Sequence, residues 1–138
     1  MKNGKTVLVF GTFDGLHDGH RFFLREARKL GNKLIASVTT DEVIQQIKNH
    51  TPTYHLEERL RALEASGLVH LAVAGDKVLG NWSALRQWKP DIVAIGYDQA
   101  KLEEKLDKLI AKEHLPITLV KISAHDPDRL HSRLLRKN

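Results

Sequence analysis

A chain of 138 residues has room for one domain with a sizeable core, so we predict a single domain over residues 1–138. Apolar residues make up 41% and charged residues 28% of the chain, which excludes a disordered protein, and the absence of cysteine excludes disulfides and thiolate metal sites. The formal charge of +5 favours an anionic partner such as a nucleotide, a phosphorylated metabolite or nucleic acid, although a solvated basic surface explains it equally well.

Strand-like and helical patterns alternate along the chain. Apolar, β-branched runs predict strands, and apolar residues at helical spacing predict helices. In chain order we predict strand 6–10, helix 20–30, strand 33–38, helices 41–47 and 57–65, strand 68–74, helix 81–88, strand 91–95, helix 100–114, strand 116–122 and a helical tail at 131–136. Five strands separated by helices predict an α/β fold: a Rossmann-like, doubly wound, five-stranded parallel sheet in a three-layer α/β/α sandwich.

Single residues refine this outline. Gly31 is placed to cap the C-terminus of helix 20–30, and Thr40 is placed to cap the N-terminus of helix 41–47. Trp82 and Trp88 lie on one predicted helix, where we expect them to pack against the sheet. The segment 50–55 is predicted to be a mobile loop.

The chain shows neither a membrane-spanning segment nor a signal peptide. No apolar run reaches the roughly 20 residues that cross a bilayer, and the N-terminus lacks an apolar region followed by a small-residue cleavage site. Together with the absence of cysteine, these features predict a cytoplasmic protein with no membrane partner.

The segment from Gly11 to Gly19 directly follows the first predicted strand. In an open parallel sheet, ligands bind beyond the carboxyl ends of the strands, so this loop should lie at the binding edge. Its glycines let the backbone approach a ligand, and the helix that follows offers free N–H groups to phosphate. The dinucleotide pattern Gly-x-Gly-x-x-Gly and the Walker A pattern are both absent. Phosphate binding therefore needs different chemistry.

His17 and His20 can supply that chemistry. Two imidazoles three residues apart at a loop-to-helix junction can converge on one phosphoryl group, while Gly19 keeps the turn compact. Their N–H groups can stabilise oxygens that gain charge during an in-line displacement. A zinc site is a weaker interpretation because no further ligand set is evident, and two ordinary surface histidines are another. The position directly after a strand favours phosphate chemistry.

The pattern Gly11-Thr12-Phe13-Asp14-x-x-His17-x-Gly19-His20 resembles the signature of the cytidylyltransferase-like nucleotidyltransferases. These enzymes join a nucleoside triphosphate to a phosphate-bearing acceptor and release pyrophosphate. Lys48 and the pair Glu58-Arg59 resemble the basic residues that follow the second strand of that family. Residues 89–99, which include Gly96-Tyr97-Asp98-Gln99, resemble its strand and nucleotide-binding loop.

Within that family, the loop 96–99 and the short length resemble the small stand-alone FAD synthases. This resemblance implies transfer of AMP from ATP to FMN, giving FAD and pyrophosphate, with Mg²⁺ accompanying ATP and no prosthetic group. Residues 130–135 resemble the FAD-synthase tail, except that His131 replaces a serine. The alternatives are a CTP-dependent glycerol-3-phosphate cytidylyltransferase, whose Arg-x-x-Gly-Ile-Ser-Thr-Ser signature is missing, and a phosphopantetheine adenylyltransferase.

The resemblance and the chemistry of the motif imply roles for individual residues. His17, His20 and Lys48 are expected to be catalytic, and Lys48 and Arg59 are expected to bind the acceptor. No residue is assigned as a protein ligand of a metal. The residues expected to bind the nucleotide are Gly11, Thr12, Phe13, Asp14, Gly19, Gly96, Tyr97, Asp98, Ser132 and Arg133.

Several of these residues also have structural alternatives. Asp14 either caps the backbone amides that follow it or helps to hold Mg²⁺ through water. Asp98 either binds the base or ribose or caps the helix that begins at residue 100. Lys48 and Arg59 either neutralise phosphate or belong to a solvated helix face, where Glu58 can pair with Arg59.

The expected partners are therefore ATP and a phosphate-bearing small molecule, with FMN the best match and a homodimer left open. The non-enzymatic rivals are a nucleic-acid-binding domain and a nucleotide-sensing module that does not turn over. Nothing in the sequence resembles a recognition helix or an exposed aromatic-basic sheet, so we predict no nucleic-acid partner.

Overall fold

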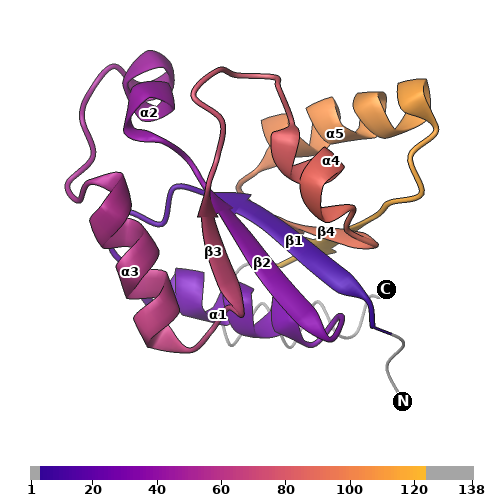
Figure 1. The fold of residues 1–138 in the computed structure, drawn as a ribbon, viewed down its shortest axis with the longest axis horizontal. Helices are drawn as coiled ribbons and strands as arrows, with labels where there is room; N and C mark the ends of the chain where they lie inside the picture. Colours follow the sequence, from indigo (N-terminus) through magenta and orange to yellow (C-terminus); the bar gives the residue numbers. More distant parts are fainter. Residues whose placement is uncertain (1–3, 124–138) are drawn as a thin grey trace.

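A computed structural model describes residues 4–123, which form a parallel sheet between two layers of helices (Figure 1). The predicted helical tail, including Ser132 and Arg133, lies outside the described residues. The elements are β1 (Thr6–Gly11), α1 (Asp18–Arg28), β2 (Lys33–Val38), α2 (Asp41–Lys48), α3 (Leu56–Ser66), β3 (Leu71–Ala74), α4 (Ser83–Trp88), β4 (Ile92–Gly96), α5 (Ala100–Glu113) and β5 (Thr118–Ile122). This order of elements confirms the predicted α/β fold.

The five strands form one sheet in the order β3-β2-β1-β4-β5, and every neighbouring pair is parallel. The chain therefore starts in the middle of the sheet, winds outward through β2 and β3, and returns to the other side of β1 through β4 and β5. The strand order reverses between β1 and β4. In a doubly wound sheet, ligands bind outside the carboxyl ends of the strands at this reversal.

Successive residues along the central strands face opposite sides of the sheet, and both sides are buried. Val7 and Val9 of β1 contribute to one core, under α1 and α3, whereas Leu8 contributes to the other, under α4 and α5. Figure 1 shows α1 below the sheet, with α4 and α5 above it. All residues of β4 are buried, as expected for a strand covered by helices on both faces.

Of the two predicted helix caps, the one at Gly31 is wrong and the one at Thr40 is confirmed. α1 ends at Arg28 with Lys29 as its C-cap, so Gly31 does not cap the helix. A Cβ on Gly31 would lie 2.6 Å from the carbonyl oxygen of Lys5, and this close backbone approach requires glycine. Thr40 does cap α2, because its hydroxyl accepts a hydrogen bond from the N–H of Val43.

The two tryptophans pack against the sheet as predicted, although only Trp88 lies within the helix. Trp82 and Trp88 both pack against the core formed with α4 and α5, and the ring of Trp82 meets Phe10 edge-on at 5.7 Å. Helix α4 begins only at Ser83, because Trp82 adopts a left-handed conformation with φ of 54°. Among the described residues, no helix combines the length and apolar character needed to cross a bilayer.

Candidate active site

The loop between β1 and α1 turns sharply around Phe13. This residue has a φ of 51°, which is uncommon for a residue other than glycine, and its ring is buried in the core beneath α1. A Cβ on Gly11 would lie 2.7 Å from that ring. Glycine at position 11 therefore lets the Phe13 ring pass close beneath the end of β1, which anchors the loop to the core.

His17 is the N-cap of α1. Its Nδ1 accepts hydrogen bonds from the backbone N–H groups of Gly19, at 3.0 Å, and His20, at 3.3 Å. Because Nδ1 is an acceptor in both contacts, the proton of the neutral ring resides on Nε2. The helix cap thus fixes His17 in the tautomer that leaves Nε2–H free to donate.

The ring of His20 stacks on the ring of His17, with centroids 3.7 Å apart and an interplanar angle of 19°. The Nδ1 atom of His20 lies 3.2 Å from the carbonyl oxygen of Gly15. Burial lowers the pKa of His20 and the neighbouring His17 lowers it further, whereas the Gly15 carbonyl and Asp98 act in the opposite direction. An anion bound beside the rings would favour the protonated form of His20, in which both ring nitrogens are donors.

Gly19 lies against this pair. A Cβ at position 19 would lie 3.0 Å from Cε1 of His17 and 3.2 Å from its Nδ1, which is tighter than ordinary packing. A side chain at this position would press on the His17 ring. The spacing His-x-Gly-His is therefore consistent with a compact turn in which both rings lie side by side.

A cavity of about 490 Å³ opens beside the two histidines at the carboxyl ends of β1 and β4. It brings together residues from five parts of the chain: the end of β1 with the β1–α1 loop, α1, the end of α2, the end of β4 with the loop that follows it, and the end of β5. The predicted site residues that line it are Gly11, Thr12, Phe13, Asp14, His17, Gly19, His20, Lys48, Gly96, Tyr97 and Asp98. This volume is typical of a site for one small molecule.

The cavity also contains residues to which the sequence analysis gave no role. They are Phe10, Phe22, Phe23, Gln99, Ile122 and Ser123. Gln99 has a specific structural function: its side chain accepts a hydrogen bond from the N–H of Gly96 at 2.8 Å and donates one to the carbonyl of Phe10 at 2.7 Å. It therefore ties the end of β4 to the end of β1 across the reversal of strand order. Its place beside Asp98 in the predicted nucleotide loop was the only signal for it.

Asp98 is not the cap of α5, because the N-cap position is occupied by Gln99. The Asp98 carboxylate lies in the wall of the cavity and acts on His20 through its charge. It makes no hydrogen bond with any of the described residues and is exposed to solvent. This leaves both of its oxygens available to a ligand.

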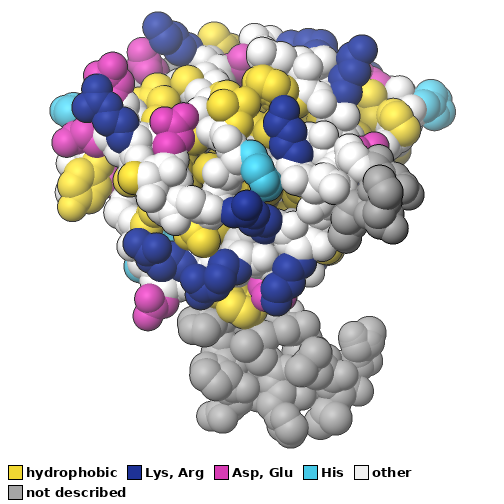
Figure 2. Space-filling view, turned by 60° about the horizontal axis from the view of Figure 1, so that its bottom comes forward, with side chains coloured by type: hydrophobic (Ala, Val, Ile, Leu, Met, Phe, Trp, Pro, Cys, Tyr) yellow, Lys and Arg dark blue, Asp and Glu magenta, His cyan; other side chains and the backbone are white. Residues whose placement is uncertain are grey.

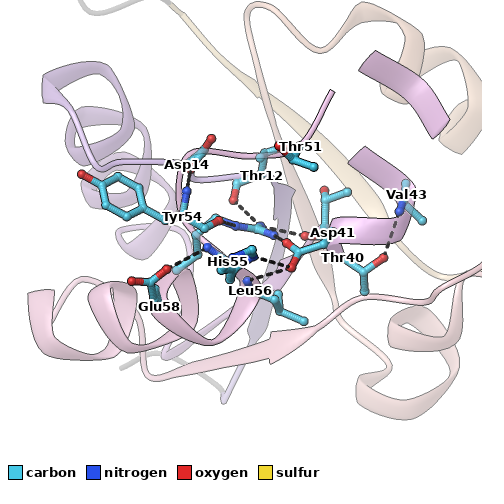
Figure 3. A network of polar contacts seen from close by, with 12 residues as sticks. Thr12, Asp14, Thr40, Asp41, Val43, Thr51, Tyr54, His55, Leu56 and Glu58 are labelled. Atoms are coloured by element: carbon cyan, nitrogen blue, oxygen red, sulfur yellow. Dashed lines mark hydrogen bonds and ion pairs between the residues drawn. The ribbon is translucent and has the colours of Figure 1, made fainter. Parts of the chain in front are cut away.

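Asp14 contacts a segment that is distant in the sequence and not the residues that follow it. One carboxylate oxygen accepts a hydrogen bond from the backbone N–H of Thr53 at 2.7 Å. The other accepts one from the N–H of Tyr54 at 2.8 Å (Figure 3). Asp14 thus caps backbone amides, although these belong to a segment about forty residues away and not to the residues that follow it. The segment 50–55, expected to be mobile, is held by these bonds to the loop between β1 and α1, called the motif loop below.

Arg59 differs most from its predicted position. Its side chain is buried, with 1% of the residue exposed, and its guanidinium donates to the carbonyls of Tyr54, Thr12 and Thr39 and pairs with Asp41. It does not line the cavity beside the histidines. Glu58, the alternative partner, instead accepts from the N–H of His55. The predicted direct contact of Arg59 with the acceptor is therefore not supported, because its donors are used within the fold.

Lys48 lies in the last turn of α2. Among the described residues, it is the one basic side chain, lysine or arginine, that lines the cavity. Figure 2 shows other Lys and Arg side chains distributed over one face of the molecule, several of them close together and some beside Asp or Glu. The other described Lys and Arg residues thus do not line this cavity. Within residues 4–123, no group of three or more His, Asp or Glu side chains is arranged to hold a metal ion.

Comparisons with known proteins identify the family of this chain. Residues 8–138 match the family model described as cytidylyltransferase-like. The chain is 38% identical over 116 residues to an FAD synthase of Methanosarcina barkeri, covering 84% of this chain and 81% of that protein. It is 33% identical over 125 residues to an FAD synthase of Aciduliprofundum boonei, covering 91% and 83%.

Solved structures show the same fold. The crystal structure of a lipopolysaccharide core biosynthesis protein from Thermoplasma volcanium superimposes with a TM-score of 0.80 at 31% identity, covering 88% of this chain and 98% of that one. A pantothenate synthetase from Thermus thermophilus has a TM-score of 0.62 at 16% identity, covering 86% and 55%, and this likeness concerns the fold alone. With a family model that matches residues 8–138, relatives above 30% identity over most of their length and the paired histidines beside the cavity, the chain belongs to the cytidylyltransferase-like nucleotidyltransferases.

Proposed function

We propose that this protein transfers AMP from ATP to FMN, forming FAD and pyrophosphate. The observation that carries the proposal is the stacked pair His17 and His20 at the N-terminus of α1, facing a cavity at the reversal of strand order. The choice of acceptor is supported by the relatives, several of which are named FAD synthase at 33–38% identity.

In the proposed reaction an oxygen of the FMN phosphate attacks the α-phosphorus of ATP. A new P–O bond forms as the bond between the α-phosphorus and the bridging oxygen breaks, and pyrophosphate leaves with that bond's electrons. The attacking phosphate is already ionised, so no strong general base is needed. The enzyme contributes position and charge stabilisation.

His17 and His20 are assigned to the triphosphate. The Nε2–H of His17 would donate to phosphate oxygens that gain charge in the transition state. The free backbone N–H groups and the positive end of the α1 dipole act in the same direction. His20 joins as a second donor when phosphate charge favours its protonated form.

The other assignments follow the walls of the cavity. Lys48 lines the cavity and would neutralise phosphate charge on the acceptor or the leaving group. Gly96, Tyr97 and Asp98 would bind the base and ribose, with the free carboxylate of Asp98 as an acceptor. The predicted triphosphate contacts of Ser132 and Arg133 fall outside the described residues.

Mg²⁺ fits this site as a companion of ATP. The oxygens of Asp14 are bonded to backbone amides, and no cluster of ligands for a metal occurs within the described part of the chain. Magnesium tolerates such sites because it is often held by substrate phosphates and water. The ion would neutralise charge on the phosphates during transfer.

The test is a matrix of ATP and CTP against FMN, glycerol 3-phosphate and phosphopantetheine, with released pyrophosphate as the readout. We expect turnover with ATP and FMN, and FAD as the product by chromatography. Turnover only with another pair would replace this proposal with that activity, and nucleotide binding without pyrophosphate release would indicate a sensing module.

A further inference from the structure

One peptide segment, centred on Tyr54, is held from both sides. Its N–H donates to Oδ1 of Asp14 at 2.8 Å, and its carbonyl accepts from Nε of Arg59 at 2.9 Å (Figure 3). The neighbouring N–H of Thr53 donates to the second carboxylate oxygen of Asp14 at 2.7 Å. Both oxygens of Asp14 are therefore committed to this segment, which connects α2 to α3.

Arg59 extends the same connection to the sheet. Its Nη1 donates to the carbonyl of Thr12 at 2.9 Å and to the carbonyl of Thr39 at 2.7 Å. These carbonyls belong to the residues that directly follow β1 and β2. A single buried guanidinium thus joins the ends of two strands to the α2–α3 connection. Asp41, at the start of α2, balances its charge.

This connection begins directly after Lys48. Helix α2 ends at Lys48, and Asn49 takes a left-handed conformation with φ of 58°, so the chain turns away at that point. Only a few residues, including the buried Pro52, separate Lys48 from Thr53 and Tyr54. The hydrogen bonds that Asp14 and Arg59 make to Thr53 and Tyr54 are called the clamp below. The other partner of the clamp, Asp14, lies three residues before His17 in the motif loop. The clamp therefore ties the lysine side of the cavity to the histidine side.

We propose that Asp14 and Arg59 are positioning residues that hold residues 49–54 against the motif loop, and that Asp14 acts on the reaction by placing Lys48 at the cavity. This inference rests on the proposed function, because it gives Lys48 its task at the acceptor phosphate. It assigns the Asp14 carboxylate to backbone amides and not to the metal or the nucleotide. Loss of the clamp should impair the acceptor side of the reaction and leave ATP binding largely intact.

The test is a double-mutant cycle with Asp14→Asn and Lys48→Ala. In Asp14→Asn the amide oxygen accepts only one of the two N–H groups, and the amide NH₂ faces the other as a second donor. We expect the KM for FMN to rise about tenfold while the KM for ATP changes less than about twofold. Because Asp14 acts through Lys48, the double variant should be no worse than Lys48→Ala alone. Additive losses, or a loss confined to ATP, would overturn the proposal.

Hydrogen exchange gives a second readout that does not depend on the acceptor. The backbone amides of residues 49–55 should exchange faster in Asp14→Asn than in the wild type, with no change in β4. Asp107→Asn, on the exposed face of α5, is the matched control and should change neither exchange nor kinetics. Unchanged exchange in Asp14→Asn refutes the clamp. A wild type that does not adenylylate FMN refutes the proposed function instead, and the cycle is then measured with the acceptor that the enzyme uses.

Discussion

Replacing Arg59 with methionine tests whether the buried guanidinium stabilises the fold. Methionine keeps a long, unbranched stem and removes the charge and every donor. The carbonyls of Tyr54, Thr12 and Thr39 then lose their hydrogen bonds, and Asp41 loses its partner. Three backbone carbonyls would then lack the guanidinium donor that binds them in the wild type.

The magnitude follows from burial and from the number of partners. Removing one member of a buried ion pair typically costs about 3–5 kcal/mol, because the other charge is left uncompensated. The Asp41 side chain is 35% exposed, so water can partly replace the guanidinium there. The three carbonyls add to the cost, because each buried acceptor without a donor costs about 1–3 kcal/mol. We therefore expect the free energy of unfolding to fall by about 3–5 kcal/mol, against a total of about 5–15 kcal/mol for a typical domain.

Urea unfolding followed by the fluorescence of Trp82 and Trp88 measures this loss. The matched control is Arg61→Met, an exposed arginine on the same helix, which should change the free energy by no more than about 0.5 kcal/mol. Although burial raises it, hydrogen bonds from Arg59 and from the N–H of Leu56 leave the pKa of Asp41 below its ordinary value. This stabilisation is present above the carboxyl pKa and is lost on acidification, so the gap between wild type and Arg59→Met should narrow below about pH 4. A loss under about 1 kcal/mol at pH 7 would refute the reasoning.

Two histidines give further predictions. His17→Ala should lower turnover at least about a hundredfold. His17→Asn should lower turnover as much but keep the α1 cap and near-native stability, because the asparagine oxygen can replace Nδ1 as the acceptor. Near-normal turnover in His17→Asn would contradict the catalytic role. Burial, with the nearby Arg28 and Lys33, lowers the pKa of His70, whose Nδ1 accepts from the N–H of Leu34 at 2.9 Å. The unfolded chain therefore binds the proton more readily, so this contribution to stability is present above about pH 6.5 and lost as the pH falls below it. In His70→Asn, which keeps an acceptor, the free energy of unfolding should depend less on pH between pH 7 and 5 than in the wild type. The control His114→Asn, at an exposed position, should keep the pH dependence of the wild type. The same pH dependence in all three proteins would count against the explanation.

The architecture was predictable because local patterns dictate it. The run 91–95 is apolar throughout, and a strand can be so only if helices cover both of its faces, as they cover β4. Alternation of strands with helices then leaves a parallel sheet as the natural arrangement, and the parallel pairing of every neighbouring pair of strands confirms it. The position of the motif loop followed from the same rule, since the carboxyl ends of parallel strands share one edge.

Contacts between distant segments were not predictable in this way. Asp14 meets Thr53 and Tyr54 across 39 and 40 residues, and Arg59 meets Thr12 across 47. Such contacts depend on how the loops after β1 and β2 approach each other, which no local period encodes. An arginine next to a glutamate at a helix start looks like a surface residue in the sequence. The catalytic and binding roles of the residues around the cavity remain predictions that the kinetic experiments address.

The side chain of His17 has a structural role as the cap of α1 and a proposed catalytic role as a donor to phosphate. An ordinary helix cap is a serine, threonine, aspartate or asparagine, each of which ends at the atoms that meet the backbone. Histidine carries a second nitrogen beyond the capping atom. When Nδ1 accepts the N–H groups of Gly19 and His20, the proton is forced onto Nε2 and the ring is oriented by the helix itself. The helix N-terminus thus prepares a directed donor before any substrate binds, and the cost of orienting it is met during folding and not during the reaction.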